Sequence, residues 1–141
     1  MQSFLPYADF SKSASCLDGQ RLGKQRVEAW QIYQALTIGS RWKCHPAVKM
    51  WQGYEAALVL YGIEICKEWI MRGYKDNMLE RFLINYQKYA KYPYWLGKQS
   101  FHSVHRSILL AKNYEWYKQF NWYEKPAIKN SQNKWPYEWP K

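Results

Sequence analysis

Hydrophobic positions recur at helical spacing over residues 47–72. Apolar or aromatic side chains follow one another at steps of three or four residues, at Ala47, Trp51, Tyr54, Leu58, Tyr61, Ile65 and Trp69. A stripe of this kind covers one side of an α-helix. The pattern therefore predicts one long helix from Ala47 to about Arg72, which Gly73 ends.

Residues 18–36 show the same period with one polar and one apolar side. Arg21, Lys24, Gln25 and Glu28 project from one side, and Leu22, Ala29, Trp30, Tyr33 and Leu36 occupy much of the other. Asp18 stands where it can cap this helix, and Gly39 where it can end it. The pattern predicts an amphipathic helix with a charged side.

The rest of the chain alternates between shorter helices and irregular segments. The first residues, 1–7, are expected to form an extended arm, followed by a helical turn through Cys16 that Asp9 or Ser11 caps, and Pro46 is expected as a first helical residue. A helix is then predicted from Asp76 through Leu79, Phe82, Leu83 and Tyr86. A basic aromatic loop at 88–100 and a helix at 102–120, with Val104, Ile108, Leu109 and Tyr114 inward, complete the prediction. No segment has the alternation of a β-strand. We expect an all-α (mainly α) fold: a compact single domain over 1–141 of three to four helices, with an extended N-terminal arm and an aromatic, loop-like C-terminal tail.

The charge balance indicates a polyanionic partner. The 141 residues include 21 Lys or Arg and 11 Asp or Glu, a formal net charge of +10, which favours nucleic acid. Aromatic residues make up 19%, and aromatic faces stack on bases. For any single Trp or Tyr, a core position fits as well as a base contact.

Cysteine usage and hydropathy bear on the compartment. Cys16, Cys44 and Cys66 are odd in number and share no close spacing, which argues against a disulfide framework and for a reducing compartment. No N-terminal stretch resembles a signal peptide, and the apolar stretch 56–65 is too short to span a bilayer. We expect a monomeric cytoplasmic protein (in a host cell, if viral) without a membrane partner.

Glu28 is an acidic residue on a basic helix. Around it stand side chains that contact phosphates and base edges: Gln20, Arg21, Lys24, Gln25 and Arg26. Because a carboxylate there lowers DNA affinity, Glu28 suggests chemistry. An amine that attacks a sugar C1′ forms a Schiff base, and a nearby carboxylate stabilises the cationic intermediate. Lys24 and the α-amine of Met1 are the candidate amines, and a plain i, i+4 salt bridge between Lys24 and Glu28 is the structural alternative.

His102, His105 and Arg106 cluster at the start of the last predicted helix. They suit phosphate contact at a helix N-terminus, and equally a capping and packing role. A metal site would need more than one histidine pair, for example with Cys44 and His45. The chain has no Gly-rich phosphate loop and no Ser–His–Asp order. We expect no metal and no cofactor.

Three short sequence motifs occur in an order that resembles a known family. They are Gln20-x-Leu22 with Glu28 six residues later, Tyr54–Asp76 ending in RGYKD, and His102–Asn113 followed by the tail's Trp-Tyr elements. In this order they resemble the pyrimidine dimer DNA glycosylases of the phage endonuclease V type. The first motif is similar to the helix of that family's catalytic glutamate, the second to its long second helix, and the third to its last helix and aromatic end.

The resemblance implies a three-helix core and a bifunctional enzyme. Such enzymes cleave the glycosidic bond at the 5′ base of a cyclobutane pyrimidine dimer and then nick the strand by β-elimination, without a metal. The α-amine of Met1 would be the nucleophile and Glu28 the assisting acid, while the duplex is kinked and its target flipped. The DNA-binding set would comprise Gln20, Arg21, Lys24, Gln25, Arg26, His102, His105 and Arg106.

Two departures from the family's pattern affect these assignments. Family members expose their amine by removing Met1 before a small residue, whereas residue 2 is Gln here. Val27 stands where an arginine precedes the glutamate. The expected substrate is double-stranded DNA carrying a pyrimidine dimer or a related damaged or modified pyrimidine. The alternative function is a non-catalytic, basic, aromatic-rich nucleic-acid-binding module in which Glu28 is structural.

Overall fold

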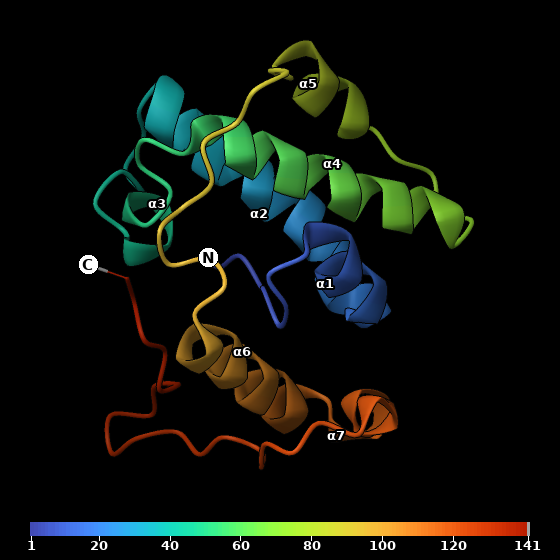
Figure 1. The fold of residues 1–141 in the computed structure, drawn as a ribbon, viewed down its shortest axis with the longest axis vertical. Coiled ribbons are helices and arrows are strands. Elements are labelled where there is room, and N and C mark those ends of the chain that lie inside the picture. Colours follow the sequence, from blue (N-terminus) through green and yellow to red (C-terminus); the bar gives the residue numbers. More distant parts are fainter. Residues whose placement is uncertain (141) are drawn as a thin grey trace.

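Helices are the regular elements of the computed structural model, which describes residues 1–140 (Figure 1). They are α1 (Phe10–Cys16), α2 (Gly19–Thr37), α3 (Pro46–Lys49), α4 (Glu55–Met71), α5 (Leu79–Ile84), α6 (Gln99–Lys112), α7 (Tyr114–Tyr117) and a 3-10 turn, η1 (Lys118–Phe120). No residue of this described range belongs to a β-strand. The prediction of a mainly α fold is confirmed.

The α2 and α4 helices form the centre of the fold. They pack against each other, α1 and α5 contact α4, and α3 contacts α2. In Figure 1, α6 and α7 lie on the other side of the blue N-terminal segment from this group. No helix in the described part of the chain is both long and apolar enough to cross a membrane.

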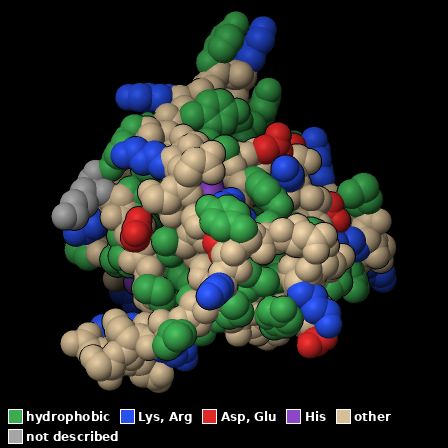
Figure 2. All heavy atoms as spheres, turned by 60° about the horizontal axis from the view of Figure 1, so that its bottom comes forward, with side chains coloured by type: hydrophobic (Ala, Val, Ile, Leu, Met, Phe, Trp, Pro, Cys, Tyr) green, Lys and Arg blue, Asp and Glu red, His purple; other side chains and the backbone are tan. Residues whose placement is uncertain are grey.

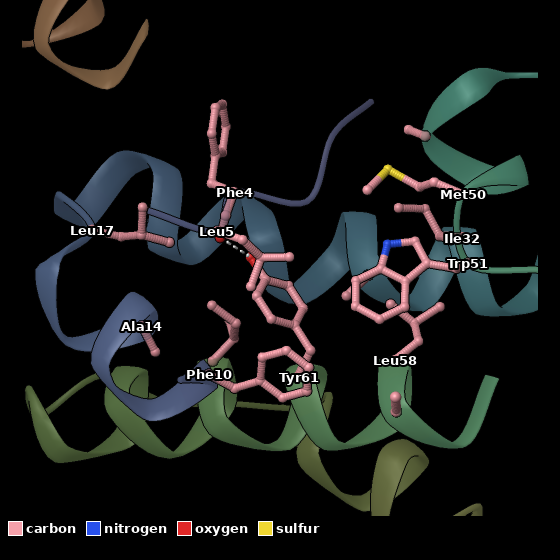
Figure 3. Packing of buried hydrophobic residues seen from close by; sticks show 14 of the residues in the cluster. Phe4, Leu5, Phe10, Ala14, Leu17, Ile32, Met50, Trp51, Leu58 and Tyr61 are labelled. Carbon is pink, nitrogen blue, oxygen red and sulfur yellow. Dashed lines mark hydrogen bonds between the residues drawn. The ribbon is translucent and has the colours of Figure 1, made fainter. Parts of the chain in front are cut away.

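The N-terminal arm, residues 1–7, fills the space between α6 and the α2–α4 pair. It has no helical residue, as predicted, yet Leu5 is fully buried and Phe4 nearly so. Figure 3 shows both residues close to Tyr61 of α4, and the dashed line marks the bond from the Tyr61 hydroxyl to the Phe4 carbonyl oxygen, 2.8 Å. Trp51 Nε1 donates to Ser3 Oγ at 2.9 Å. The arm is therefore part of the core.

The predicted long helix at 47–72 is wrong, because a turn at residues 50–54 divides it into α3 and α4. Gly53 has φ +85°, a conformation that glycine adopts without strain. Its N–H donates to Glu55 Oε1 at 3.1 Å. Trp51 lies in this turn and is buried, and its spacing from the neighbouring apolar residues is the one that a continuous helix would give. The apolar pattern therefore did not reveal the turn. Pro46 does begin α3, as predicted.

The predicted helix at 102–120 begins earlier and ends sooner. It begins at Gln99 and ends at Lys112. Asn113 breaks it with φ −153°, and the Asn113 side chain accepts the Trp116 N–H that starts α7. Ile108 and Leu109 are buried as predicted, Val104 is half-buried, and Tyr114 is exposed rather than inward.

Two aspartates accept backbone N–H groups at the starts of helices. Asp9 accepts the Lys12 N–H and caps α1, as predicted. Asp76 accepts the Leu79 N–H at 2.7 Å, at the start of α5. That helix spans Leu79–Ile84, shorter than the predicted 76–86, and Leu83 and Tyr86 of the predicted stripe are exposed.

Asp18 occupies the N-cap position of α2, but its side chain does not cap the helix. Its carboxylate instead accepts from the Tyr117 hydroxyl and from Arg21 Nη1. The predicted capping bond is therefore absent, and the carboxylate ties α2 to Tyr117 instead. The helix ends at Thr37, shortly before Gly39 with φ +99°.

Candidate active site

A cleft of about 270 Å³ lies where the start of the chain meets the first half of α2. Residues from four separate segments line it: Met1, Gln2 and Phe4 of the arm, Gln20, Arg21, Lys24 and Glu28 of α2, Lys112 of α6, and Trp135 and Tyr137 of the tail. Three basic side chains and one carboxylate face the same space. Cations near an aromatic wall suit a nucleic acid.

Glu28 lies between two amines. Its side chain is 11% exposed, and Oε2 is 3.8 Å from the α-amino nitrogen of Met1. The same oxygen accepts the Gln2 N–H at 2.7 Å. Oε1 is 3.8 Å from Lys24 Nζ. The carboxylate is thus held by the backbone of residue 2, next to the first residue of the chain.

Gln25 fastens the arm to α2. It is 1% exposed, its Oε1 accepts the Phe4 N–H at 2.9 Å, and its Nε2 donates to the Gln2 carbonyl oxygen at 2.8 Å. The Tyr61 hydroxyl lies 2.6 Å from the same Oε1. Since these partners enclose the amide, Gln25 positions the arm. The protein encloses the amide, whereas the sequence predicted that it contacts DNA.

His102 and His105 hold the backbone of Leu5. His105 Nδ1 accepts the Leu5 N–H at 2.9 Å. His102 Nε2 accepts the Gly97 N–H, so its Nδ1 carries the proton and donates to the Leu5 carbonyl oxygen at 2.7 Å. Burial lowers the pKa of His105 to about 3 and also lowers the pKa of His102. Both rings are therefore neutral near pH 7.

Arg106 holds the next residue of the arm. Its Nη1 donates to the Pro6 carbonyl oxygen at 2.8 Å, and its Nη2 donates to Glu124 Oε2 at 2.7 Å. Ser103 Oγ donates to the same carboxylate. The cluster of His102, His105 and Arg106 is thus buried against the arm. This favours the packing alternative over the predicted phosphate contact, because the arm's backbone takes the place of the anion.

The predicted α2 set divides into two groups. Gln20, Arg21, Lys24 and Glu28 come together at the cleft. Arg26 does not line it, since Arg26 Nη1 is paired with Asp76 and its guanidinium lies 4.7 Å from the centre of the Trp69 ring. Arg26 therefore ties α2 to the segment that follows α4.

Sequence reasoning did not single out Lys112, Trp135 and Tyr137. Lys112 Nζ lies 5.2 Å from the centre of the Trp135 ring. Burial, with Arg21 as the next contribution, lowers the pKa of Lys112. Burial raises the pKa of Tyr137 to about 12. The basic, aromatic composition of the tail was the available signal, but only the fold brings it beside residues 1 and 28.

Cys44 and His45, which a metal site would have needed beside the histidine pair, do not line the cleft. No group of three or more His, Cys, Asp and Glu side chains that could hold a metal occurs in residues 1–140. Cys44 is exposed, and His45 Nδ1 accepts the Ala47 N–H at the start of α3.

Figure 2 shows one face of the molecule, where Lys and Arg side chains lie among large hydrophobic ones.

Comparison with known proteins identifies one family. Residues 1–82 match the sequence profile of a family described as pyrimidine dimer DNA glycosylase. The match covers more than half of the chain, with the arm, Gln25 and Glu28 inside it and Lys112 and Trp135 outside. No curated protein and no solved structure matches the chain.

Proposed function

This chain belongs to the pyrimidine dimer DNA glycosylase family, and we propose that it excises its target base through a Schiff base on the α-amine of Met1. In this proposal Glu28 assists, and the same intermediate carries the AP-lyase step. The substrate is double-stranded DNA with a cyclobutane pyrimidine dimer or a related damaged or modified pyrimidine.

One observation carries the proposal: the position of the Glu28 carboxylate between the start of the chain and a basic cleft. Oε2 lies 3.8 Å from the Met1 amine and 2.7 Å from the Gln2 nitrogen. A nucleophilic amine needs a base within reach, and its cationic product needs a nearby negative charge. Glu28 meets both needs.

In the proposed reaction each bond that forms replaces one that breaks, and each proton has a donor and an acceptor. The neutral amine attacks C1′, its nitrogen–carbon bond forms, and the glycosidic bond breaks as the base leaves and takes a proton from solvent. The proton lost by the amine passes to Glu28 and then to the sugar ring oxygen, which opens to the protonated imine. Glu28 next takes a C2′ proton, and the bond from C3′ to the phosphate oxygen breaks.

The rest of the cleft suits the binding of DNA around this centre. Arg21, Lys24 and Lys112 line it and would neutralise phosphates near the target. Trp135 and Tyr137 form an aromatic wall against which an extruded base can stack. Gln25 and the α6 cluster hold the arm, so the amine stays near Glu28 without a metal or cofactor.

A non-catalytic binding module remains the second candidate, and the Lys24–Glu28 pair is the observation in its favour. The two residues form an i, i+4 contact of 3.8 Å, which on a helix surface contributes roughly 0.3–0.5 kcal/mol. This role leaves unexplained why Glu28 also accepts the Gln2 N–H from inside the cleft. It predicts that Glu28→Gln binds DNA as the native protein does, and that no covalent intermediate forms.

The test is borohydride trapping on three duplexes, with one thymine dimer, with one abasic site, and undamaged. We expect an adduct on the first two, and mass spectrometry should place it on the α-amine. The intact mass also shows whether Met1 is retained; if it is removed, the Gln2 amine takes its place. An adduct at Lys24 would reassign the nucleophile, an adduct on the abasic duplex alone would exclude the dimer as substrate, and no adduct would refute the mechanism.

A further inference from the structure

The segment of residues 86–98 joins α5 to α6 and contributes nothing to the cleft. It runs as an extended chain between the two helices in Figure 1. It lies outside the family match at 1–82. The sequence between Glu80 and Glu115 contains no acidic residue, and this part of it carries Lys88, Lys91 and Lys98. We call residues 86–98 the Tyr/Lys segment.

Large aromatic rings in this segment are open to solvent. Tyr86 is 52% exposed, Tyr89 83% and Tyr92 54%, at intervals of three residues. A tyrosine ring offers more to the fold when it is buried, so three exposed rings in seven residues favour a binding role. Tyr92 also contacts the Phe10 ring, at 5.9 Å between centroids.

Lysines accompany these rings. Lys88 Nζ lies 5.5 Å from the centre of the Tyr89 ring, and Lys98 Nζ lies 5.1 Å from that of Tyr94. Lys91 Nζ lies 5.6 Å from the Tyr54 ring of the neighbouring turn. Flat rings beside cations provide the two contacts that a strand of nucleic acid needs, stacking for the base and charge for the phosphate.

The segment is anchored at both ends. Trp95 is buried, its Nε1 donates to the Met50 carbonyl oxygen at 2.9 Å, and its ring contacts Trp51. Before the other end, Phe82 of the preceding helix α5 is fully buried. Because the anchors restrict the chain between them, less conformational freedom is lost when a ligand stacks on it.

We propose that the Tyr/Lys segment is a second nucleic-acid-binding surface, which stacks unpaired bases of single-stranded DNA. Exposed rings can stack only on bases that are not enclosed in a duplex. The charge favours a polyanion over a protein, although Glu64 lies beside Tyr92 and Glu138 beside Lys98 at the edges of the segment. The inference goes beyond the proposed function, because excision at the cleft does not require this surface.

The test measures binding of a fluorescent, undamaged oligothymidine by anisotropy. We expect Tyr86→Ala/Tyr89→Ala/Tyr92→Ala to bind at least tenfold more weakly than the native protein, since the removal of each ring weakens stacking. Tyr86→Ala/Tyr89→Ala is measured beside it because Tyr92 also packs on the body. The matched control is Tyr114→Ala/Tyr123→Ala, which removes two exposed rings elsewhere and should bind within about twofold of the native protein.

Further variants separate stacking from charge. Replacement of the three tyrosines by Phe keeps the rings and should retain the affinity. Lys88→Gln/Lys91→Gln should reduce the slope of log affinity against log salt by roughly 1.4, about 0.7 for each phosphate that the protein no longer neutralises. Ultraviolet crosslinks to the oligothymidine should map to residues 86–92.

The outcome is independent of the catalytic proposal. The triple Tyr→Ala variant, which leaves the cleft intact, should still form the borohydride adduct on an abasic duplex. The inference is overturned if both Tyr→Ala variants keep native affinity for oligothymidine, or if the crosslinks map only to the cleft. Failure of the adduct in the native protein would instead count against the mechanism alone.

Discussion

The α2 and α6 helices lie on either side of the N-terminal arm and hold polar side chains in two different ways. On α2, Lys24 is 74% exposed and Glu28 opens to the cleft. On α6, His102, His105 and Arg106 are buried and bonded to the arm. On α2, Lys24 and Glu28 face the cleft while Gln25 binds the arm, whereas on α6 all three residues of the cluster face the arm's backbone.

The difference arises from the arm, which has no strand beside it to pair with. Its N–H and carbonyl groups are buried, and buried backbone groups need hydrogen-bond partners. Gln25 supplies partners for residues 2 and 4, and the α6 cluster supplies them for Leu5 and Pro6. A polar cluster next to a buried, irregular segment of chain therefore supplies hydrogen bonds to that segment's backbone before it can serve as a ligand site.

The largest effect should follow from Glu28→Gln, which tests whether the carboxylate on α2 acts in chemistry or only holds the arm. The amide oxygen can still accept the Gln2 N–H, so the fold should persist, but the base is lost. We expect single-turnover cleavage of a lesion duplex to fall by about 10²–10⁴-fold. A fall of less than tenfold would show that the carboxylate only holds the arm.

Next in size is Arg106→Met, which challenges the α6 side. The substitution leaves the buried Glu124 carboxylate and the Pro6 carbonyl oxygen without their partner. We expect the free energy of unfolding to fall by about 3–5 kcal/mol, measured by urea denaturation. Arg106→Met/Glu124→Gln is the control and should recover part of the loss, because the unpaired charge is gone. If Arg106 contacted DNA instead, stability would be unchanged and only DNA affinity would fall.

His105 should make stability depend on pH. Its folded pKa of about 3 lies below the usual value of about 6.5, so the unfolded chain binds the proton first as the pH falls. Stability should therefore be complete above pH 6.5 and decrease below it, by about 2 kcal/mol between pH 7.5 and 5. The lowered pKa of His102 acts in the same direction.

The control for this titration is His105→Asn, whose side-chain oxygen can accept the Leu5 N–H but does not titrate. Urea denaturation of both proteins across this range should give a flatter pH profile for the variant. Equal profiles would mean that the ring is open to water and that the α6 cluster is not the buried support described above.

The smallest effect on stability should come from Lys24→Gln. The lysine is exposed and its contact with Glu28 is 3.8 Å, so we expect a change below about 0.5 kcal/mol. Duplex binding should weaken, with the slope of log affinity against log salt reduced by roughly 0.9. An unchanged slope would show that Lys24 does not contact a DNA phosphate.

Local patterns were enough to predict several elements and to single out Glu28 as a candidate. Helical period and end signals placed α2, the Asp9 cap and the start of α3 at Pro46, because these depend on neighbours within one or two turns. The same reasoning missed the turn at Gly53 and the break at Asn113, where the apolar spacing continued across a change of direction. Glu28 stood out because its charge differs from that of its neighbours.

The sequence by itself determined the helical character of the chain, its positive charge and the contrast that marks Glu28, since these follow from composition and short-range periodicity. Only the tertiary structure decided which polar residues reach the cleft. Gln25 and His105 have the chemistry of DNA-contacting residues, but in the folded protein they are hydrogen-bonded to the buried backbone of the arm. Residues 1, 28, 112 and 135 meet because packing brings together segments that no local pattern connects.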